Sequence, residues 1–273
     1  MTAEMEPTDP GYLAQGVRPP PRGEDLPYDD GEPMETARHY QQMSLLIETL
    51  DDHWRDRDDV FVGGNMFVYF SEIQARKRDF RGPDFFVVMD TTRRERKSWV
   101  VWEEDGRTPD LVIELTSPST EHVDRGDKMR IYAHLRVAEY VLFDPWTAKL
   151  EAYELDGATR TYHLRAPGEN GRYASRVTGL ALGVVEGTYR NVETKWLRWL
   201  TPEGAVLPSS RDLADAVRAR ASAETARADA ETARADAETS RADAETARAD
   251  AETARADAAT MRIAELEAAL ARR

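Results

Sequence analysis

Apolar residues between positions 33 and 54 recur at helical spacing, and acidic residues fall off the stripe that they form. A stripe with this three-to-four-residue spacing predicts an amphipathic helix that packs on a core. The apolar residues of the stripe are Met43, Leu46, Ile47, Leu50 and Trp54.

Short apolar runs follow this helix and are separated by glycine and proline. Runs of this length and composition are typical of buried strands. We expect such strands at 61–70, 84–89 and 111–116. Gly63 and Gly64, inside the first run, indicate either a bulge or a close approach of another backbone.

The stretch after the third strand predicts a crossover connection. A turn at 117–120 leads into a helical pattern at about 121–135, and an apolar run at 139–143 follows at once. The order strand, helix, strand is typical of a crossover within one sheet.

The next part of the chain predicts an antiparallel extension of that sheet, because Asp156-Gly157 and Pro167-Gly168 supply turn chemistry. The further elements that we expect are strands at 99–103, 149–155, 161–165 and 173–177 and a short helical patch at 196–200. The predicted fold class is therefore α/β, with a mixed sheet flanked by helices.

Composition divides the chain into three parts. Residues 1–33 contain a proline cluster and many acidic residues and glycines, which indicates a flexible or loosely docked lead-in. Residues 34–205 form the expected globular domain. Residues 206–273 hold a linker and a repetitive tail, which predicts a long Ala-rich helix.

Five heptads of the form A-E-T-A/S-R-A-D run without interruption from 223 to 257. With the first Ala at position a, the seam is almost wholly Ala, Arg stands at e and Asp at g. Asp229 could then meet Arg234 of a parallel partner helix, as in a coiled coil. Within one helix, Arg227 can instead pair with Glu224 and Glu231. The tail is therefore a candidate for homo-oligomerisation or a solitary spacer helix.

Composition restricts the chemistry and the partners. The 273 residues include no cysteine, so a bound metal must use carboxylate, imidazole or carbonyl ligands, which favours hard cations such as Mg²⁺. No apolar run approaches the roughly 20 residues that span a bilayer, and the acidic N-terminus is unlike a signal peptide, so we expect a cytoplasmic protein. The net charge is −14, and residues 1–210 hold 26 basic and 37 acidic residues, which counts against nucleic acid as a partner.

A carboxylate inside an apolar run is the most informative feature of the sequence. Glu114 lies within the run LVIELT, where an ionised side chain costs several kcal/mol unless it is paired or bound to metal. Asp110 is about 13 Å away along the same strand at ~3.3 Å per residue, too far to share a cation. Asp84, on a strand expected to be adjacent, can approach Glu114 closely enough for a Mg²⁺ site. A turn role for both aspartates and a buried ion pair for Glu114 are the alternatives.

The helix expected after Glu114 carries a basic residue that can reach these acids. Asp124, Lys128 and Tyr132 follow one another at i, i+4 and i+8, and thus share one face. The long stem of Lys128 could bring its ammonium to the acids. A surface pair of Asp124 with Lys128 explains the spacing equally well.

These segments resemble, in order, the Uma-two-type restriction endonuclease family, a branch of the PD-(D/E)XK nuclease superfamily. The resemblance covers about residues 27–205. The segments that carry it are GGNMFVYF, RGPDFFVVMD, TPDLVIELTSPST, DRGDKMRIYAHLRVAEYVLFDP and the upstream PYDDGEPMETARHY.

The resemblance implies a restriction-endonuclease-like fold and a site for Mg²⁺ or Mn²⁺. Asp84 and Glu114 would bind the cation, the carbonyl of Leu115 would complete the set, and a lysine would position or activate the water that attacks a DNA phosphodiester. The usual lysine stands two residues after the glutamate, where this chain has Thr116. The resemblance implies that Lys128 takes the role.

Two function classes follow. The first is a Mg²⁺-dependent deoxyribonuclease with Asp84, Glu114 and Lys128 as its catalytic set. The second is an inactive nuclease-fold module that binds or assembles through its helical tail, which the acidic charge and Thr116 favour. Action on RNA or branched DNA stays open, and His39, on the apolar face of the first helix, is interpreted as a packing residue.

Overall fold

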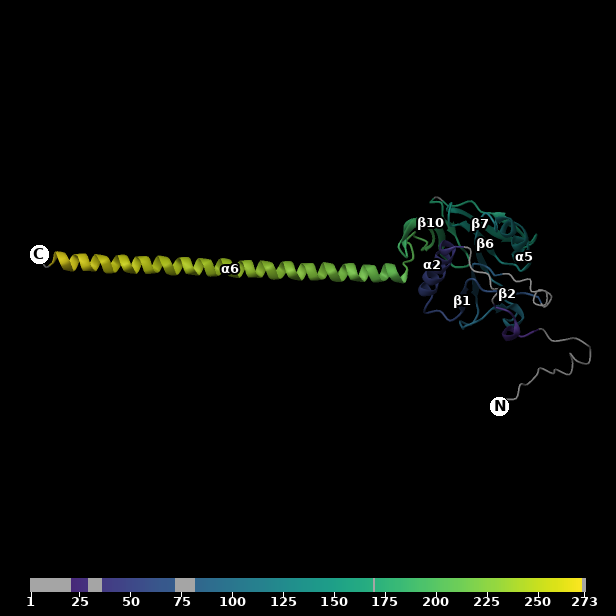
Figure 1. Cartoon of the computed structure of the whole chain (residues 1–273), viewed down its shortest axis with the longest axis horizontal. Helices are drawn as coiled ribbons and strands as arrows, with labels where there is room; N and C mark the ends of the chain where they lie inside the picture. The colour runs from purple at the N-terminus through teal and green to yellow at the C-terminus, as the bar shows by residue number, and fades with distance from the viewer. Residues whose placement is uncertain (1–20, 29–35, 72–81, 169, 272–273) are drawn as a thin grey trace, which may run out of the picture. The chain divides into compact units, whose positions relative to one another are not determined.

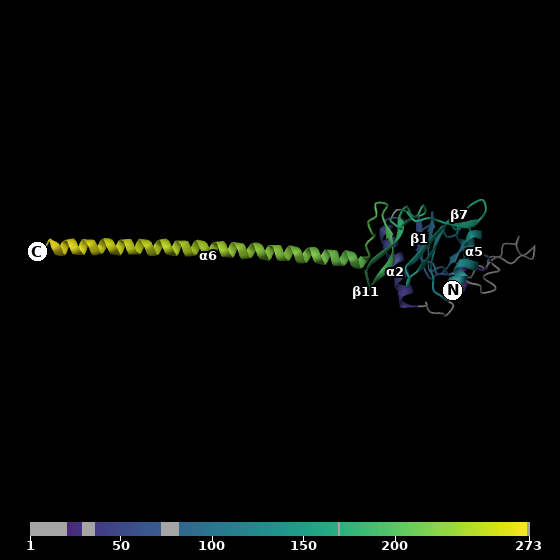
Figure 2. The same cartoon turned by 90° about the horizontal axis from the view of Figure 1, so that it is seen from above.

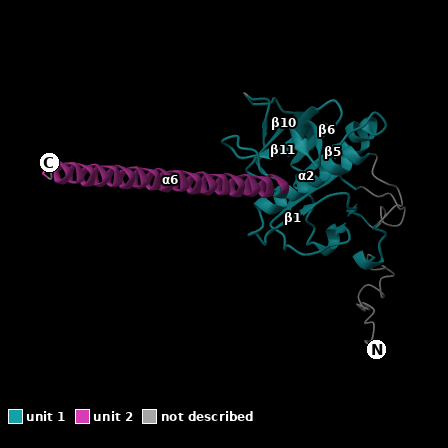
Figure 3. Cartoon of the chain, turned by 60° about the vertical axis from the view of Figure 1, so that its left-hand side comes forward, with its two compact units in different colours: residues 1–210 teal, residues 211–273 magenta. Residues whose placement is uncertain are grey.

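A computed structural model describes residues 21–28, 36–71, 82–168 and 170–271. The chain divides into two compact units, residues 1–210 and residues 211–273, which Figure 3 distinguishes by colour.

A six-stranded mixed sheet forms the centre of the first unit. Its strand order is β1-β3-β5-β6-β7-β8. β5 and β6 are parallel, and the other neighbours are antiparallel. The strands are β1 (Val60–Gly63), β3 (Phe85–Met89), β5 (Leu111–Leu115), β6 (Glu139–Asp144), β7 (Lys149–Asp156) and β8 (Thr161–Leu164). The crossover between β5 and β6, the antiparallel extension through β7 and β8, and the mixed sheet are confirmed. The strand expected at 173–177 does not continue this extension, because β9 (Tyr173–Ala174) pairs with β10 (Ala181–Tyr189) in a separate sheet.

Helices cover both faces of this sheet (Figures 1 and 2). α2 (Ala37–His53) begins after Thr36, whose side chain accepts a hydrogen bond from the backbone of His39 as an N-cap. The buried stripe of α2 packs on one face of the sheet together with Ile113 and Leu115. The opposite face packs against the crossover helix, which consists of α4 (Glu121–Val123), a π-helical turn η3 (Asp124–Lys128) and α5 (Met129–His134).

A second, three-stranded sheet contains β9 (Tyr173–Ala174), β10 (Ala181–Tyr189) and β11 (Val192–Leu200). The predicted helical patch at 196–200 is therefore wrong, because these residues form the end of β11. The side-chain amide of Gln42 accepts from the Leu197 N–H and donates to the Leu197 carbonyl, both at 2.9 Å. Trp196, Leu197 and Trp199 are all buried, so both faces of this strand are covered.

The strand expected at 61–70 divides in two. β1 ends at Gly63, and β2 (Val68–Tyr69) pairs in parallel with β4 (Trp99–Val100), which is followed by a 3₁₀ turn η2 (Val101–Glu103). The close approach expected at the two glycines is confirmed, since a Cβ atom on Gly64 would lie 2.6 Å from the carbonyl oxygen of Asp84.

The described part of the lead-in is docked rather than flexible. Residues 21–28 contain a 3₁₀ turn η1 (Gly23–Asp25), and Leu26 is buried in a small cluster with Phe67, Tyr69 and Val100. The indole of Trp102 donates a hydrogen bond to the Pro21 carbonyl at 3.0 Å. Residues 1–20 and 29–33 of the expected lead-in lie outside the described residues.

The second unit is one helix. α6 (Ser210–Leu270) is 61 residues long, and none of these residues, all of which the structure describes, is buried. Among the helices in the described ranges, none combines the length and the apolar character needed to cross a bilayer.

Candidate functional site

Glu114 is placed in the interior by the alternation of β5. Leu111, Ile113 and Leu115 face the core on the α2 side, so Val112 and Glu114 point to the side of the crossover helix. Glu114 has no exposed surface. A carboxylate in this position must be satisfied by the protein or by a bound cation.

Both oxygens of Glu114 have partners. Its Oε2 lies 2.9 Å from the Lys128 ammonium and accepts a longer bond, 3.4 Å, from the backbone N–H of Asp84. Its Oε1 accepts a hydrogen bond of 3.0 Å from the Tyr132 hydroxyl. Glu114 is therefore the centre of a buried cluster that gathers residues from β5, from the start of β3 and from the crossover helix.

Asp84 meets Glu114 because β3 and β5 are antiparallel neighbours. Phe85 pairs with Ile113, which places the preceding Asp84 beside Glu114. The backbone N–H of Leu115 donates to Asp84 Oδ2 at 2.7 Å, and the backbone N–H of Asp84 donates in return to Glu114 Oε2 at 3.4 Å. Asp84 is half-buried, in contrast to Glu114. The predicted proximity of the two acids is confirmed.

Lys128 lies between two acids rather than on the surface. Its Nζ atom is 2.9 Å from Asp124 Oδ1 as well as 2.9 Å from Glu114 Oε2, and its side chain is 20% exposed. Asp124 and Lys128 are the first and last residues of the π turn η3. The Tyr140 hydroxyl donates to the Asp124 carbonyl at 2.9 Å. The alternative of a surface pair is wrong, because both members of the pair face the sheet.

The interior location changes the acidity of the cluster. Burial raises the pKa of Glu114 to about 8, although the Lys128 ammonium opposes this effect. Burial likewise raises the pKa of Asp84 to about 6. Burial tends to lower the pKa of Lys128, but the carboxylates of Glu114, Asp124 and Asp84 outweigh it and raise that pKa. The lysine is therefore a permanent cation, and the carboxyl groups hold protons at mildly acidic pH.

These shifts predict a pH dependence of stability. Both carboxyl groups have a higher pKa in the folded state than in the unfolded state, so their protonated forms stabilise the fold. This stabilisation is complete at a pH below the ordinary pKa values. It is lost as pH rises through about 6 for Asp84 and about 8 for Glu114. With chelator present, the melting temperature of the parent minus that of Glu114→Gln should fall between pH 5 and pH 9. Thermal unfolding followed by circular dichroism measures this difference, and a difference that rises with pH would contradict the assignment.

The donor set suits a hard divalent cation. Asp84 and Glu114 offer carboxylate oxygens from neighbouring strands, and Leu115, the last residue of β5, could add a backbone carbonyl. Across the described ranges, no set of three or more His, Cys, Asp or Glu side chains converges for metal binding. A cation here would depend on two carboxylates supplemented by a carbonyl and water, which is the manner in which Mg²⁺ is usually bound.

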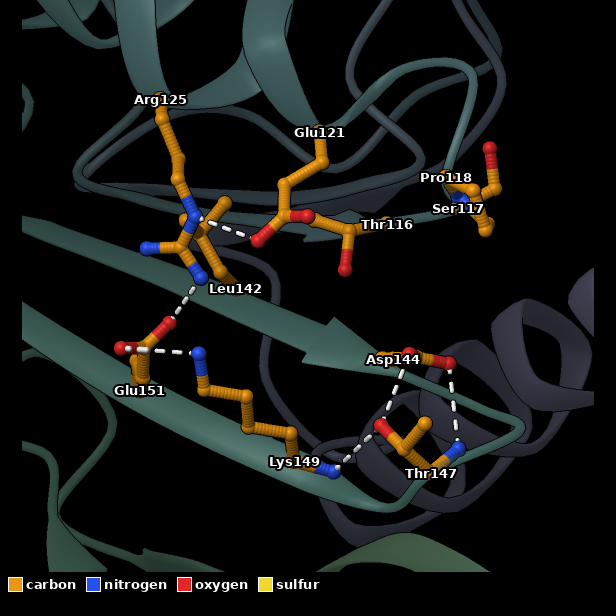
Figure 4. A pocket seen from close by; sticks show the side chains of 10 residues that line it. All are labelled: Thr116, Ser117, Pro118, Glu121, Arg125, Leu142, Asp144, Thr147, Lys149 and Glu151. Atoms are coloured by element: carbon orange, nitrogen blue, oxygen red, sulfur yellow. Dashed lines mark hydrogen bonds and ion pairs between the residues drawn. The ribbon is translucent and has the colours of Figure 1, made fainter.

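A pocket of about 350 Å³ lies where β5 and β6 end side by side (Figure 4). Leu142, the register partner of Glu114, lines it, so the pocket and the acidic cluster share two strands. Arg125 lines this pocket and forms ion pairs with Glu121 and Glu151, which line it too. Thr116, at the position of the usual lysine, lines this pocket and is buried.

Two other residues considered from the sequence have structural roles. Asp110 accepts a 2.7 Å hydrogen bond from the Met89 backbone at the far end of β5 from Glu114. His39 is buried, and its Nδ1 atom lies 2.9 Å from the Thr36 hydroxyl at the start of α2. Tyr132 and Asp124 were left out of the predicted site although both contact it, and their four-residue spacing from Lys128 was the signal that could have included them.

Comparisons with known proteins give a family match and two relatives. The family Uma2, described as "Putative restriction endonuclease", matches residues 13–197. The protein "Uncharacterized protein slr1290" of Synechocystis is 28% identical over 119 residues, 43% of this chain and 57% of that protein, so this chain spans just over half the length of that relative. A solved structure, "a putative nuclease belonging to DUF820" from Anabaena variabilis, is 16% identical with a TM-score of 0.38, covering 52% of this chain and 76% of the other.

Proposed function

This chain belongs to the Uma2 family, whose description is "Putative restriction endonuclease", and on this premise we propose that it is a divalent-cation-dependent nuclease that hydrolyses phosphodiester bonds of DNA. The observation that carries the proposal is the buried cluster in which the Lys128 ammonium lies 2.9 Å from Glu114, beside Asp84. Stability alone does not account for a fully buried glutamate paired with a lysine beside a second carboxyl group, because replacing buried ion pairs by apolar residues is often neutral or stabilising.

The residues divide the chemistry among them. Asp84 and Glu114 would hold Mg²⁺ or Mn²⁺ together with the Leu115 carbonyl. When bound, such a cation supplies Lewis-acid stabilisation of the phosphate and a water of lowered pKa. Lys128, whose pKa the neighbouring carboxylates raise, would orient the attacking water or stabilise negative charge on the phosphate. Tyr132 fixes Glu114 through its 3.0 Å hydrogen bond.

A second candidate is a noncatalytic binding or assembly module with the same fold. The charge of residues 1–210, with 26 basic and 37 acidic residues, favours it, because a DNA-binding surface usually has a basic excess. The occupation of both Glu114 oxygens by Lys128, Tyr132 and Asp84 favours it too. The two candidates differ in one measurable property, which is whether phosphodiester bonds are broken.

Cleavage of supercoiled plasmid DNA is the direct test. We expect the full chain to convert the supercoiled plasmid to nicked or linear forms when Mg²⁺ or Mn²⁺ is present. Cleavage should stop when a chelator is added. Structured RNA and branched DNA, assayed in parallel, would identify a different substrate. A folded chain that binds Mn²⁺ but leaves every substrate intact would support the assembly module instead.

A further inference from the structure

The helix α6 presents two charged columns along its fully exposed length. The Arg column is Arg227, Arg234, Arg241, Arg248 and Arg255, and the Asp column is Asp229, Asp236, Asp243, Asp250 and Asp257. Alanines recurring at alternating spacings of three and four residues, with Ser240 in one place, form a seam between the columns. The columns therefore flank the seam on either side, as the e and g positions flank the a and d positions of a coiled coil.

Ion pairs within a single helix can neutralise the Arg column but not the Asp column. Arg227 has Glu224 three residues before it and Glu231 four residues after it, and both spacings allow ion pairs. Asp229 has no basic residue at either spacing, because the residues three and four positions away on either side are Thr225, Ala226, Thr232 and Ala233. The same holds at each repeat, so the Asp column has no basic neighbour that a lone helix would bring to it.

A second copy of the helix supplies that neighbour in one orientation. In a parallel, in-register pair, each g position faces the e position five residues later in the partner, so Asp229 meets Arg234. The relation persists to the end of the repeat, where Asp257 meets Arg262. In an antiparallel pair, e faces e and g faces g, so arginines would meet arginines and aspartates would meet aspartates.

We infer that two copies of this chain associate through α6 as a parallel, in-register coiled coil. The Ala seam lets the two helices approach closely but removes little apolar surface from water, so the charged columns select the partner and its direction. The exposed side chain of Met261 stands at the next d position of the same register, so it extends the seam with apolar area that a single helix leaves in water. Association should therefore weaken as salt is raised.

Reversing the Asp column tests the pairing. Light scattering of the full chain should give twice the monomer mass of 30.9 kDa, and changing the five aspartates to arginine should give the monomer mass. The matched control changes Ala228, Ala235, Ala242, Ala249 and Ala256, which face away from the seam, to arginine and should remain dimeric. Circular dichroism verifies that every variant keeps its helix. A monomeric parent, or a charge-reversed variant that stays dimeric, would overturn the inference.

Single cysteines test the direction, because the chain has none of its own. Ala226→Cys and Ala251→Cys lie at d and a positions of the seam near opposite ends of the repeat, so each should form a disulfide-linked dimer with itself under mild oxidation. Ala228→Cys, on the outer face, should not. Cross-linking only when Ala226→Cys is mixed with Ala251→Cys would show an antiparallel pair, in which a faces d, and would overturn the inference. None of these readouts involves cleavage, so their result is independent of the proposed nuclease activity.

Discussion

Replacing Glu114 by glutamine is expected to lower metal-dependent plasmid cleavage by at least about a hundredfold, because binding of the cation contributes several kcal/mol to the transition state and each 1.36 kcal/mol is a factor of ten. Glutamine keeps the size of the side chain and an acceptor for Lys128 or Tyr132, but it removes the negative charge. The loss should therefore appear in activity and in Mn²⁺ binding, measured by calorimetry, while the circular dichroism spectrum is unchanged.

Asp110→Asn is the matched control for this change. Asp110 lies at the other end of β5, and asparagine keeps the oxygen that accepts the 2.7 Å bond from the Met89 backbone. Its cleavage rate should stay near that of the parent. If Glu114→Gln cleaves as fast as Asp110→Asn, Glu114 is not a cation ligand and its role is structural.

Removing the ammonium of Lys128 should have the largest effect on stability. Lys128→Ala leaves Glu114 and Asp124 in the interior without their 2.9 Å ion pairs, and breaking a buried pair in this way costs about 3–5 kcal/mol. Urea denaturation in chelator measures this loss. Mn²⁺ should restore part of the stability, because a cation held by Asp84 and Glu114 neutralises the charge that the lysine leaves behind.

Lys149→Ala is the control for the loss of a lysine. The Lys149 side chain is 59% exposed and lies 3.6 Å from Glu151 at the rim of the pocket. Its removal should change the free energy of unfolding by no more than about 0.5 kcal/mol. Equal effects of the two substitutions would mean that Lys128 is not the counter-ion of the buried acids.

The strands around the candidate site could be predicted because their sequences are unambiguous. The apolar runs of β3 and β5 are short and bounded by Pro83 and Pro109, and alternation along β5 fixes the direction of Glu114. The pairing of Asp84 with Glu114 follows from those two facts once the strands are neighbours.

The hairpin of β10 and β11 escaped prediction for a local reason. Tyr189 and Val192 pair across a two-residue turn, and both turn residues, Arg190 and Asn191, have positive φ values of 47° and 65°. This is the conformation that Asn-Gly pairs usually mark, and arginine in the first place hides it. The buried end of β11 is apolar on both faces, so its sequence lacks the alternation of a half-buried strand and reads as helical.

The partners of Lys128 could not be decided from spacing. A separation of four residues from Asp124 is compatible with a surface pair and with a buried one. The difference arises from the packing of the crossover helix on the sheet and from the π turn η3, and neither is encoded in a recognisable local pattern.

Gly64 gives the acidic pair a support from outside the sheet. Asp84 precedes β3, and its carbonyl oxygen accepts a 3.2 Å bond from the Asn65 N–H in a place where Gly64 leaves no room for a side chain. The segment after β1 thus packs against the backbone at Asp84 and restricts its position, although its side chains do not take part in the hydrogen bonds of the cluster. The position of Asp84 consequently depends on this loop as well as on the pairing of β3 with β5, so a side chain at position 64 would push on the backbone that carries one of the two acids.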